Sequence, residues 1–205
     1  MPAEIVIINY GMGNLRSVQN RFGRLGMDTL ISSDANEILN AKKLVLPGVG
    51  HFANGMKNLR ESGFIEILQQ KVLEENCPIL GICLGMQLLT DFSEEGEVAG
   101  LGFIKGKTIR FRFEKKVLKI PHMGWNTLTL HKESPLFQGV TPEDIFYFVH
   151  SYHVVCDNKE DIVSTSTYGI TFTSALQRNN IYGTQFHPEK SHDCGNKLLR
   201  NFLLI

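Results

Sequence analysis

The sequence predicts an α/β protein with a mostly parallel sheet, helices on both faces, and additional antiparallel strands in the second half. In the first half, short apolar runs alternate with amphipathic stretches, as in parallel sheets with crossover helices. From about residue 100, strand-like pieces follow one another with few helix signals between them. Only the end of the chain, GNKLLRNFLLI, has a helical pattern again.

The first half contains four expected strands and two expected helices. Leu15, Val18, Phe22 and Leu25 form one apolar stripe, which predicts a helix over 14–25. A longer helix is expected over 53–75, with a break near ESGF. The strands are expected at 4–10, 28–33, 43–50 (breaking at Pro47) and 78–83.

The second half should continue the same sheet and add an antiparallel layer. No repeat, linker or low-complexity segment divides the chain, so a single domain over residues 1–205 is expected. The strand candidates are 101–111, 119–130, 145–155, 161–168, 171–179 and 181–188.

Composition excludes several classes of function. Lys plus Arg and Asp plus Glu are both 21, so the zero net charge suggests neither a nucleic-acid nor a membrane partner, and favours association with a protein. No apolar run is long enough to span a bilayer, and the N-terminus does not resemble a signal peptide. The four cysteines include no Cys-x-x-Cys pair, so reduced thiols in a cytoplasmic protein are expected.

The segment GICLGMQLL places Cys83 midway between Gly81 and Gly85 at an expected strand-to-helix junction. A sharp turn there needs glycines on either side, because a Cβ would clash, and it projects the central side chain beyond the sheet. This is the arrangement of a nucleophile elbow. The start of a helix also favours a thiolate. The alternative is a small buried apolar residue, which is the role expected for Cys77, Cys156 and Cys194.

A thiolate nucleophile needs a base and a group that orients it. His187 and Glu189 are two positions apart after a strand-like segment, so an extended backbone would bring both side chains to one side. A surface loop with chance charges is the alternative. A metal site that uses His187, His192 and Cys194 is disfavoured, because their spacing fits no common zinc pattern.

Two glycine-rich turns are candidates for anion binding. In LPGVG, Gly48 and Gly50 flank Val49 after a strand, so this backbone can turn N–H groups toward an oxyanion; a tight turn without a catalytic role is the alternative. The segment NYGMGN fails as a dinucleotide fingerprint because Arg16 occupies the place of the third glycine. No cofactor is expected.

PGVG, GICLGMQLL and FHPEKS, in this order, resemble the class I glutamine amidotransferases, which are flavodoxin-like α/β domains with a Cys-His-Glu triad. NYGMGNLRSV, PGVGHF, PHMGWN and HSYH resemble more narrowly the glutaminase subunits of imidazole glycerol phosphate synthase. The resemblance runs from residue 5 to the C-terminal helix. It implies release of ammonia from glutamine for histidine biosynthesis.

The resemblance also implies a role for each matched residue. Cys83 would be the nucleophile, His187 its base and Glu189 the orienting group. The oxyanion would be held by the turn of Gly48, Val49 and Gly50 and by the Leu84 amide. Glutamine would be bound by Gln87, Glu95 and the backbone of His150, Ser151 and Tyr152.

The same family implies a partner, a (β/α)8-barrel synthase or cyclase subunit that receives the ammonia through a channel. Its contacts would match Asn14, Trp125, Tyr147 and Lys190, although Trp125 and Tyr147 would also suit a core. Two other interpretations stay open. One is a paralogue that supplies ammonia to an enzyme that aminates surface-polysaccharide sugars. The other is an inactive partner-binding module, which the intact triad disfavours.

Overall fold

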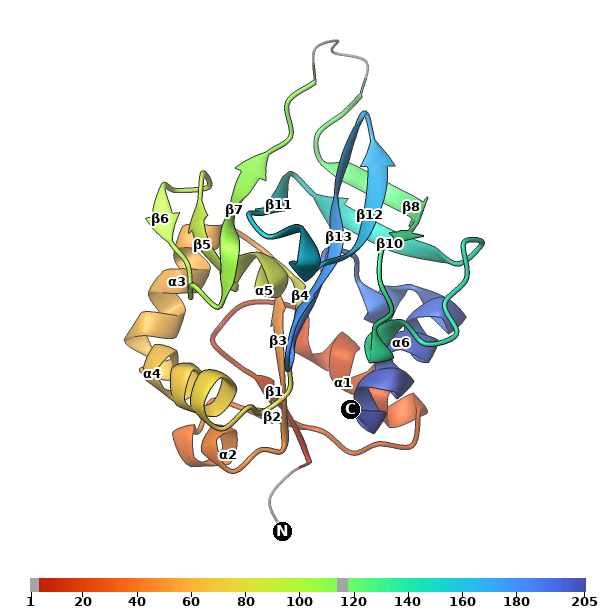
Figure 1. Cartoon of the computed structure of the whole chain (residues 1–205). Coiled ribbons are helices and arrows are strands. Elements are labelled where there is room, and N and C mark those ends of the chain that lie inside the picture. Colours follow the sequence, from red (N-terminus) through yellow and green to blue (C-terminus); the bar gives the residue numbers. More distant parts are fainter. Residues whose placement is uncertain (1–3, 114–117) are drawn as a thin grey trace.

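A mixed sheet of twelve strands forms the centre of the protein in a computed structural model that describes residues 4–113 and 118–205 (Figure 1). The strand order is β2-β1-β3-β4-β14-β13-β11-β7-β5-β6, and β12 and β9 extend it from β13. Strands β2 to β14 of this order are parallel, whereas β13 is antiparallel to β14. The predicted fold class is therefore confirmed, including the antiparallel second half.

The parallel half consists of β1 (Ile5–Ile8), β2 (Leu30–Ser32), β3 (Lys43–Gly48), β4 (Ile79–Cys83) and β14 (Ile181–Thr184). The rest of the sheet consists of β5 (Thr90–Ser93), β6 (Val98–Ala99), β7 (Ile104–Arg110), β9 (Thr129–Leu130), β11 (Tyr152–Cys156), β12 (Ile162–Tyr168) and β13 (Ile170–Arg178). A separate two-stranded sheet pairs β8 (His122–Thr127) with β10 (Ile145–His150).

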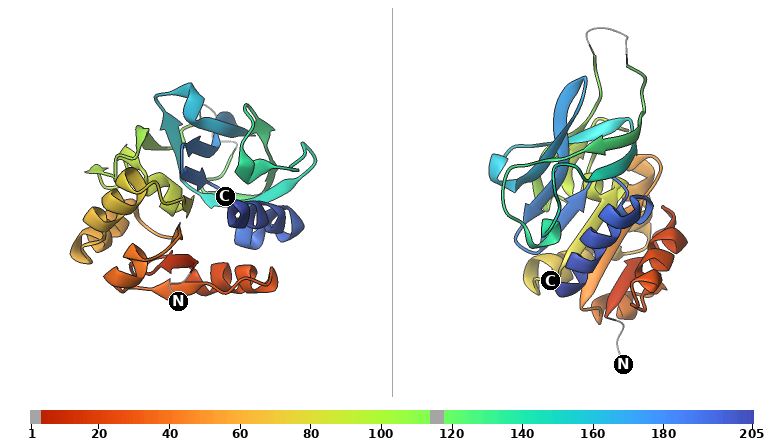
Figure 2. Two further views of the ribbon diagram at one scale, coloured as in Figure 1. Left: turned by 60° about the horizontal axis from the view of Figure 1, so that its bottom comes forward. Right: turned by 90° about the vertical axis from the view of Figure 1, so that its right-hand side faces the viewer.

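Helices cover both faces of the parallel half. On one face lie α1 (Leu15–Arg24) and α6 (His192–Leu204), side by side in both views of Figure 2. On the other face lie α2 (Ala35–Leu39), α3 (Phe52–Glu61) and α4 (Phe64–Leu68), and the last continues into a π-helical turn, Gln69–Glu74. No helix in the described ranges is long and apolar enough to cross a membrane.

Strand β1 shows why its residues fold this way. All four of its residues are buried, and successive side chains point to opposite faces. Ile5 and Ile7 pack in the cluster that contains α1 and α6, whereas Val6 and Ile8 pack in the cluster with α2, α3 and α4. A strand buried on both sides must be apolar throughout, as IVII is.

The structure corrects the prediction that the third strand breaks at Pro47. Strand β3 continues to Gly48, and Pro47 pairs with Ile82 of β4. The neighbouring strand β1 stops pairing at Val45, so the missing N–H of Pro47 leaves no bond unmade on that side. Strands β5 and β6 were not foreseen. The predicted helix break is confirmed at Gly63, whose φ of 68° suits glycine.

The glycines on either side of Cys83 allow β4 to turn directly into α5 (Leu84–Leu88). A Cβ on Gly81 would lie 2.8 Å from the Met86 nitrogen. A Cβ on Gly85 would lie only 1.7 Å from the Leu46 carbonyl oxygen of β3. The steric argument from the sequence is therefore confirmed, and the tighter restriction comes from the adjacent strand.

We expect Gly85→Ala to lower the free energy of unfolding by about 3 kcal/mol or more, because the backbone of β3 must move. Gly23→Ala is the matched control, since Gly23 is helical, exposed and has no atom within 4 Å of an added Cβ. It should stabilise the protein by about 0.5–1 kcal/mol. Urea unfolding measures both, and equal effects would contradict this explanation of the junction.

Candidate active site

Cys83 occupies the junction between β4 and α5 in a conformation that is rare for a residue with a side chain. Its φ is 54° and its ψ is −109°, a strained combination outside glycine. The residue is 6% exposed. Its sulfur lies 3.6 Å from Gln185 Nε2, which can donate to it. The junction therefore presents the thiol at the carboxyl edge of the parallel strands, where sheets of this kind bind ligands.

The structure brings His187 and Glu189 together through a turn rather than an extended segment. Pro188–Lys190 form a 3-10 turn with Pro188 at its first position. His187 Nδ1 lies 2.8 Å from Glu189 Oε1, and both side chains are buried. The Glu189 carbonyl accepts hydrogen bonds from Arg21 of α1, at 3.1 Å from Nε and 2.9 Å from the terminal nitrogen. The contact was expected, but the backbone reason for it was wrong.

The charge state of His187 follows from its surroundings. Burial favours the neutral ring, but a negative charge on Cys83 and the Glu189 carboxylate outweigh it and raise the pKa of His187 to about 10. Glu189 fixes the hydrogen on Nδ1. Within the described residues, Nε2 is buried and has no hydrogen-bond partner. This nitrogen is therefore available to exchange a proton with Cys83 or a bound substrate.

A cavity of about 220 Å³ opens beside the thiol. It is large enough for an amino-acid-sized ligand. Segments that are far apart in the sequence form its wall, and most are residues that the sequence analysis singled out. The lining consists of Val49, Gly50, Cys83, Leu84, Gln87, Glu95, Pro121, Val149, His150, Ser151 and Tyr152.

Of the three residues expected to form the oxyanion turn, two line the cavity and one does not. Val49 and Gly50 line the cavity, and Gly50 has a φ of 129° that only glycine adopts readily. Gly48 lies outside the lining and ends β3. A Cβ there would lie 2.6 Å from the Tyr10 hydroxyl oxygen, so Gly48 is needed for close packing beneath the turn.

Gln87 and Glu95 both line the cavity and are held by hydrogen bonds. Gln87 Nε2 lies 3.0 Å from both the Tyr152 carbonyl oxygen and Gln185 Oε1, which uses its two hydrogens. Its Oε1 therefore remains as an acceptor. Glu95 Oε2 accepts the Phe52 N–H at the start of α3, 2.8 Å away. This contact fixes the carboxylate next to the cavity.

Gln185 is a site residue that the sequence analysis missed. It is fully buried and bonds Gln87 while facing the Cys83 sulfur. A signal was available, because Gln185 lies two positions before His187 in TQFHPE. His150 lines the cavity, and its side chain pairs with His122, with 3.0 Å between His150 Nε2 and His122 Nδ1, a contact on which the sequence analysis made no prediction.

Three of the four expected partner contacts lie close together: Trp125 of β8, Tyr147 of β10, and Lys190 in the turn after β14. Trp125 is 44% exposed, opposes Tyr147 in the strand register and stacks on His192 at 5.2 Å between ring centroids. Lys190 Nζ lies 5.7 Å from the centroid of the Tyr147 ring. Asn14 is exposed and caps α1 by accepting the Ser17 N–H at 3.2 Å.

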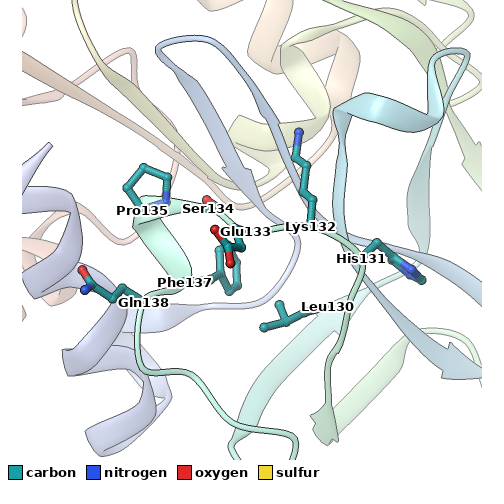
Figure 3. Close-up of a pocket in the computed structure, with 8 residues that line it drawn as sticks. All are labelled: Leu130, His131, Lys132, Glu133, Ser134, Pro135, Phe137 and Gln138. Atoms are coloured by element: carbon teal, nitrogen blue, oxygen red, sulfur yellow. The ribbon is translucent and has the colours of Figure 1, made fainter.

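Two other kinds of site bear on where the functional site lies: a metal site and a second cavity. In the described ranges, no three His, Cys, Asp or Glu side chains converge as metal ligands would. A larger cavity, of about 760 Å³, lies in the segment 130–138 (Figure 3). It contains none of the residues singled out above, and a single stretch of chain lines it. We place the candidate site at Cys83.

Comparison with known proteins finds relatives that match nearly the whole chain. The model of the family Glutamine amidotransferase class-I matches residues 6–205. Imidazole glycerol phosphate synthase subunit HisH 2 of Methanococcus maripaludis is 52% identical, over 97% of this chain and 98% of the relative. Subunit HisH 1 of Campylobacter jejuni (strain RM1221) is 50% identical, over 98% of this chain and all of the relative.

Solved structures share the fold at low sequence identity. The structure of PurLQS from Thermotoga maritima superposes with a TM-score of 0.75 at 17% identity, over 100% of this chain and 99% of that one. The glutaminase domain of Trypanosoma brucei CTPS gives a TM-score of 0.67 at 16% identity, over 97% of this chain and 91% of that one. These similarities concern the fold alone.

Iodoacetamide should alkylate Cys83 at least about ten times faster than Cys194, although Cys194 is the more exposed, because thiolates react and thiols do not. Cys83 lies next to His187, whose pKa is raised, despite burial, by a negative charge on Cys83 and by Glu189. At Cys194, burial and a 3.2 Å hydrogen bond to Asp144 raise the pKa. Peptide mapping after brief labelling measures the two rates.

Asp144→Asn is the matched control, because it removes the negative charge beside Cys194 and should speed labelling there without changing Cys83. Faster labelling of Cys194 than of Cys83 in the unmodified protein would contradict the assignment of Cys83 as the reactive thiol.

Proposed function

The chain belongs to the class I glutamine amidotransferases, and we propose that it is the glutamine-hydrolysing subunit of an imidazole glycerol phosphate synthase, active in histidine biosynthesis. The observation that carries the chemistry is the buried His187–Glu189 pair, 2.8 Å apart, beside Cys83 and its cavity of about 220 Å³. Among the described residues His187 Nε2 has no other hydrogen-bond partner, so it can exchange a proton with the Cys83 thiol.

In the first half of the proposed reaction, the Cys83 thiolate attacks the side-chain amide carbon of glutamine. The tetrahedral oxyanion is held by backbone N–H groups of the turn at Val49 and Gly50 and by the Leu84 amide, all beside the cavity. His187 gives its Nε2 proton to the amide nitrogen. The C–N bond breaks, ammonia leaves, and a γ-glutamyl thioester remains on Cys83.

In the second half, His187 takes a proton from water as the water attacks the thioester carbon. The carbon–sulfur bond breaks, glutamate forms, and the thiolate of Cys83 is restored beside a protonated His187. Glu189 accepts the hydrogen bond from His187 Nδ1, which fixes the tautomer of His187 and stabilises the imidazolium. The reaction needs only water as a co-reactant and no cofactor.

Substrate recognition follows from the cavity wall. The Gln87 Oε1 and the Glu95 carboxylate are acceptors that suit the α-ammonium group of glutamine. The backbone of His150, Ser151 and Tyr152 would bind the α-carboxylate end. With both groups of its α-carbon bound in this way, glutamine would extend its side-chain amide toward the Cys83 sulfur, which lines the same cavity.

The partner in this proposal is a (β/α)8-barrel synthase or cyclase subunit in a cytoplasmic heterodimer, and it receives ammonia through a channel. The surface formed by Trp125, Tyr147 and Lys190 supports such an interface, because exposed aromatic side chains are enriched at protein interfaces. Asn14 would contribute a separate contact.

One alternative keeps the chemistry and changes the ammonia acceptor. Some relatives carry numbered names, HisH 1 in Campylobacter jejuni and HisH 2 in Methanococcus maripaludis and Pseudomonas aeruginosa, as expected where one organism has two such subunits. A paralogue serving an enzyme that aminates surface-polysaccharide sugars would keep the same triad. The synthase that co-purifies with the chain distinguishes the two.

Cys83→Ala should abolish synthesis that depends on glutamine and leave synthesis from added ammonium salt intact, because only ammonia production uses the thiolate. The assay follows product formation by the complex with each nitrogen source. Loss of both activities would assign Cys83 a structural role and refute the mechanism.

His187→Asn should slow glutamate release by about 10²–10⁴-fold, since it removes the group that moves the proton. Glu189→Gln should cost less, because it removes only the orienting charge. Steady-state kinetics compares the two variants. Equal losses would mean that the roles are misassigned or that the pair acts as one unit.

The isolated chain should release little glutamate, and saturating synthase with its ligand should raise kcat by several orders of magnitude. Peptides flanked by glycine can flip, so the N–H of the Val49–Gly50 turn can face away until the partner binds. Lys190→Ala should weaken this activation without touching the triad. Full activity in the isolated chain would refute the switch.

A further inference from the structure

Two buried histidines, His122 of β8 and His150 of β10, face each other directly across the two-stranded sheet. His122 Nδ1 lies 3.0 Å from His150 Nε2, and His150 Nδ1 lies 2.8 Å from the Tyr152 carbonyl oxygen. The rings pack among aromatic side chains: His122 stacks on Phe148 and Tyr168, at 5.0 Å and 4.2 Å between centroids. The two histidines therefore form a chain of hydrogen bonds that ends at the Tyr152 carbonyl and passes through a layer of aromatic side chains.

The contacts fix the tautomer of both rings. A carbonyl oxygen only accepts, so His150 Nδ1 carries a hydrogen and donates it to Tyr152. His150 Nε2 is then an acceptor if the ring is neutral, and His122 Nδ1 must donate to it. Burial supports the neutral forms, because it lowers the pKa of His150 to about 3 and that of His122 to about 4.

The chain of hydrogen bonds continues from the Tyr152 carbonyl to side chains at the cavity beside Cys83. The Tyr152 carbonyl accepts a second hydrogen bond from Gln87 Nε2 at 3.0 Å. Gln87 gives its other hydrogen to Gln185 Oε1, and Gln185 therefore turns its own Nε2 toward the Cys83 sulfur, 3.6 Å away. The orientation of both amides depends on the position of this one carbonyl oxygen.

We propose that His122 and His150 are positioning residues for glutamine binding: a one-way hydrogen-bond relay from His122 through His150 to the Tyr152 carbonyl holds Gln87 with its Oε1 toward the substrate and Gln185 with its N–H toward Cys83. The relay rests on the proposed function, because it acts through groups assigned to glutamine. Neither imidazole touches the reacting atoms.

A purely structural role accounts for less of the geometry. The surrounding layer, which contains Phe111, Phe148 and Phe172, would accommodate an apolar ring at position 122. Burying an imidazole there carries a desolvation cost that only its hydrogen bonds offset. The hydrogen bond from His122 leads to a carbonyl at the cavity wall, whereas packing alone would need no donor at Nδ1.

The test compares His122→Phe with His122→Asn in the complex with the synthase, with L-glutamine varied and glutamate release measured. Phe keeps a stacked ring and removes the donor, so KM for glutamine should rise about ten-fold, as expected when a buried acceptor loses its partner. Asn places an N–H near the position of Nδ1 and should restore KM to within about three-fold of wild type. Synthesis from ammonium salt should be unchanged in both.

Histidine ¹⁵N spectra of the chain supply a second readout that does not depend on activity. His122 and His150 should both be neutral at pH 6.5 with the hydrogen on Nδ1, and His122→Phe should shift the His150 signals. A hydrogen on Nε2 of His150 would overturn the relay.

The kinetic outcomes separate the two hypotheses. Unchanged KM in His122→Phe, or equal losses in the Phe and Asn variants, would overturn the positioning role while leaving the proposed function standing. A wild-type complex that releases no glutamate from glutamine would instead refute the proposed function, and the role in glutamine binding with it.

Discussion

The backbone conformation of Cys83 is the constraint on which the rest of the site depends. A residue with φ of 54° at the end of a buried strand turns the chain into α5 within one residue, and its side chain lines the cavity. Such a conformation persists only where the surroundings fix it. Here they do so through Gly81 and Gly85, which let the turn pack against β3 with no room for a side chain.

Strand pairing then brings the base to the nucleophile. Strand β14 lies parallel to β4, with Thr184 opposite Ile82, so the residues that follow each strand leave the sheet at the same edge. Gln185 and His187 therefore lie beside Cys83, although about a hundred residues separate Cys83 from both in the sequence. The 3-10 turn at Pro188 brings Glu189 back to His187, and Arg21 of α1 holds that turn in place.

Much of this could be predicted from the sequence, because its main determinants are local. The alternation of strands and helices, the glycines around Cys83 and the helix break at Gly63 each follow from short patterns. What was missed depends on tertiary contacts. The continuation of β3 through Pro47 follows from where β1 stops pairing, and the packing role of Gly48 follows from Tyr10. The histidine pair depends on the register of β8 with β10.

The protonation of His187 in the resting protein is the most direct test of the proposed chemistry. Histidine ¹⁵N spectra recorded from pH 6 to pH 10, with the signal assigned by its absence in His187→Asn, would follow this ring. We expect that His187 is still protonated at pH 8, with its pKa raised to about 10, and that Cys83→Ala lowers this pKa. A neutral His187 at pH 8 in the unmodified protein would contradict its proposed role as the group that protonates the leaving amide nitrogen.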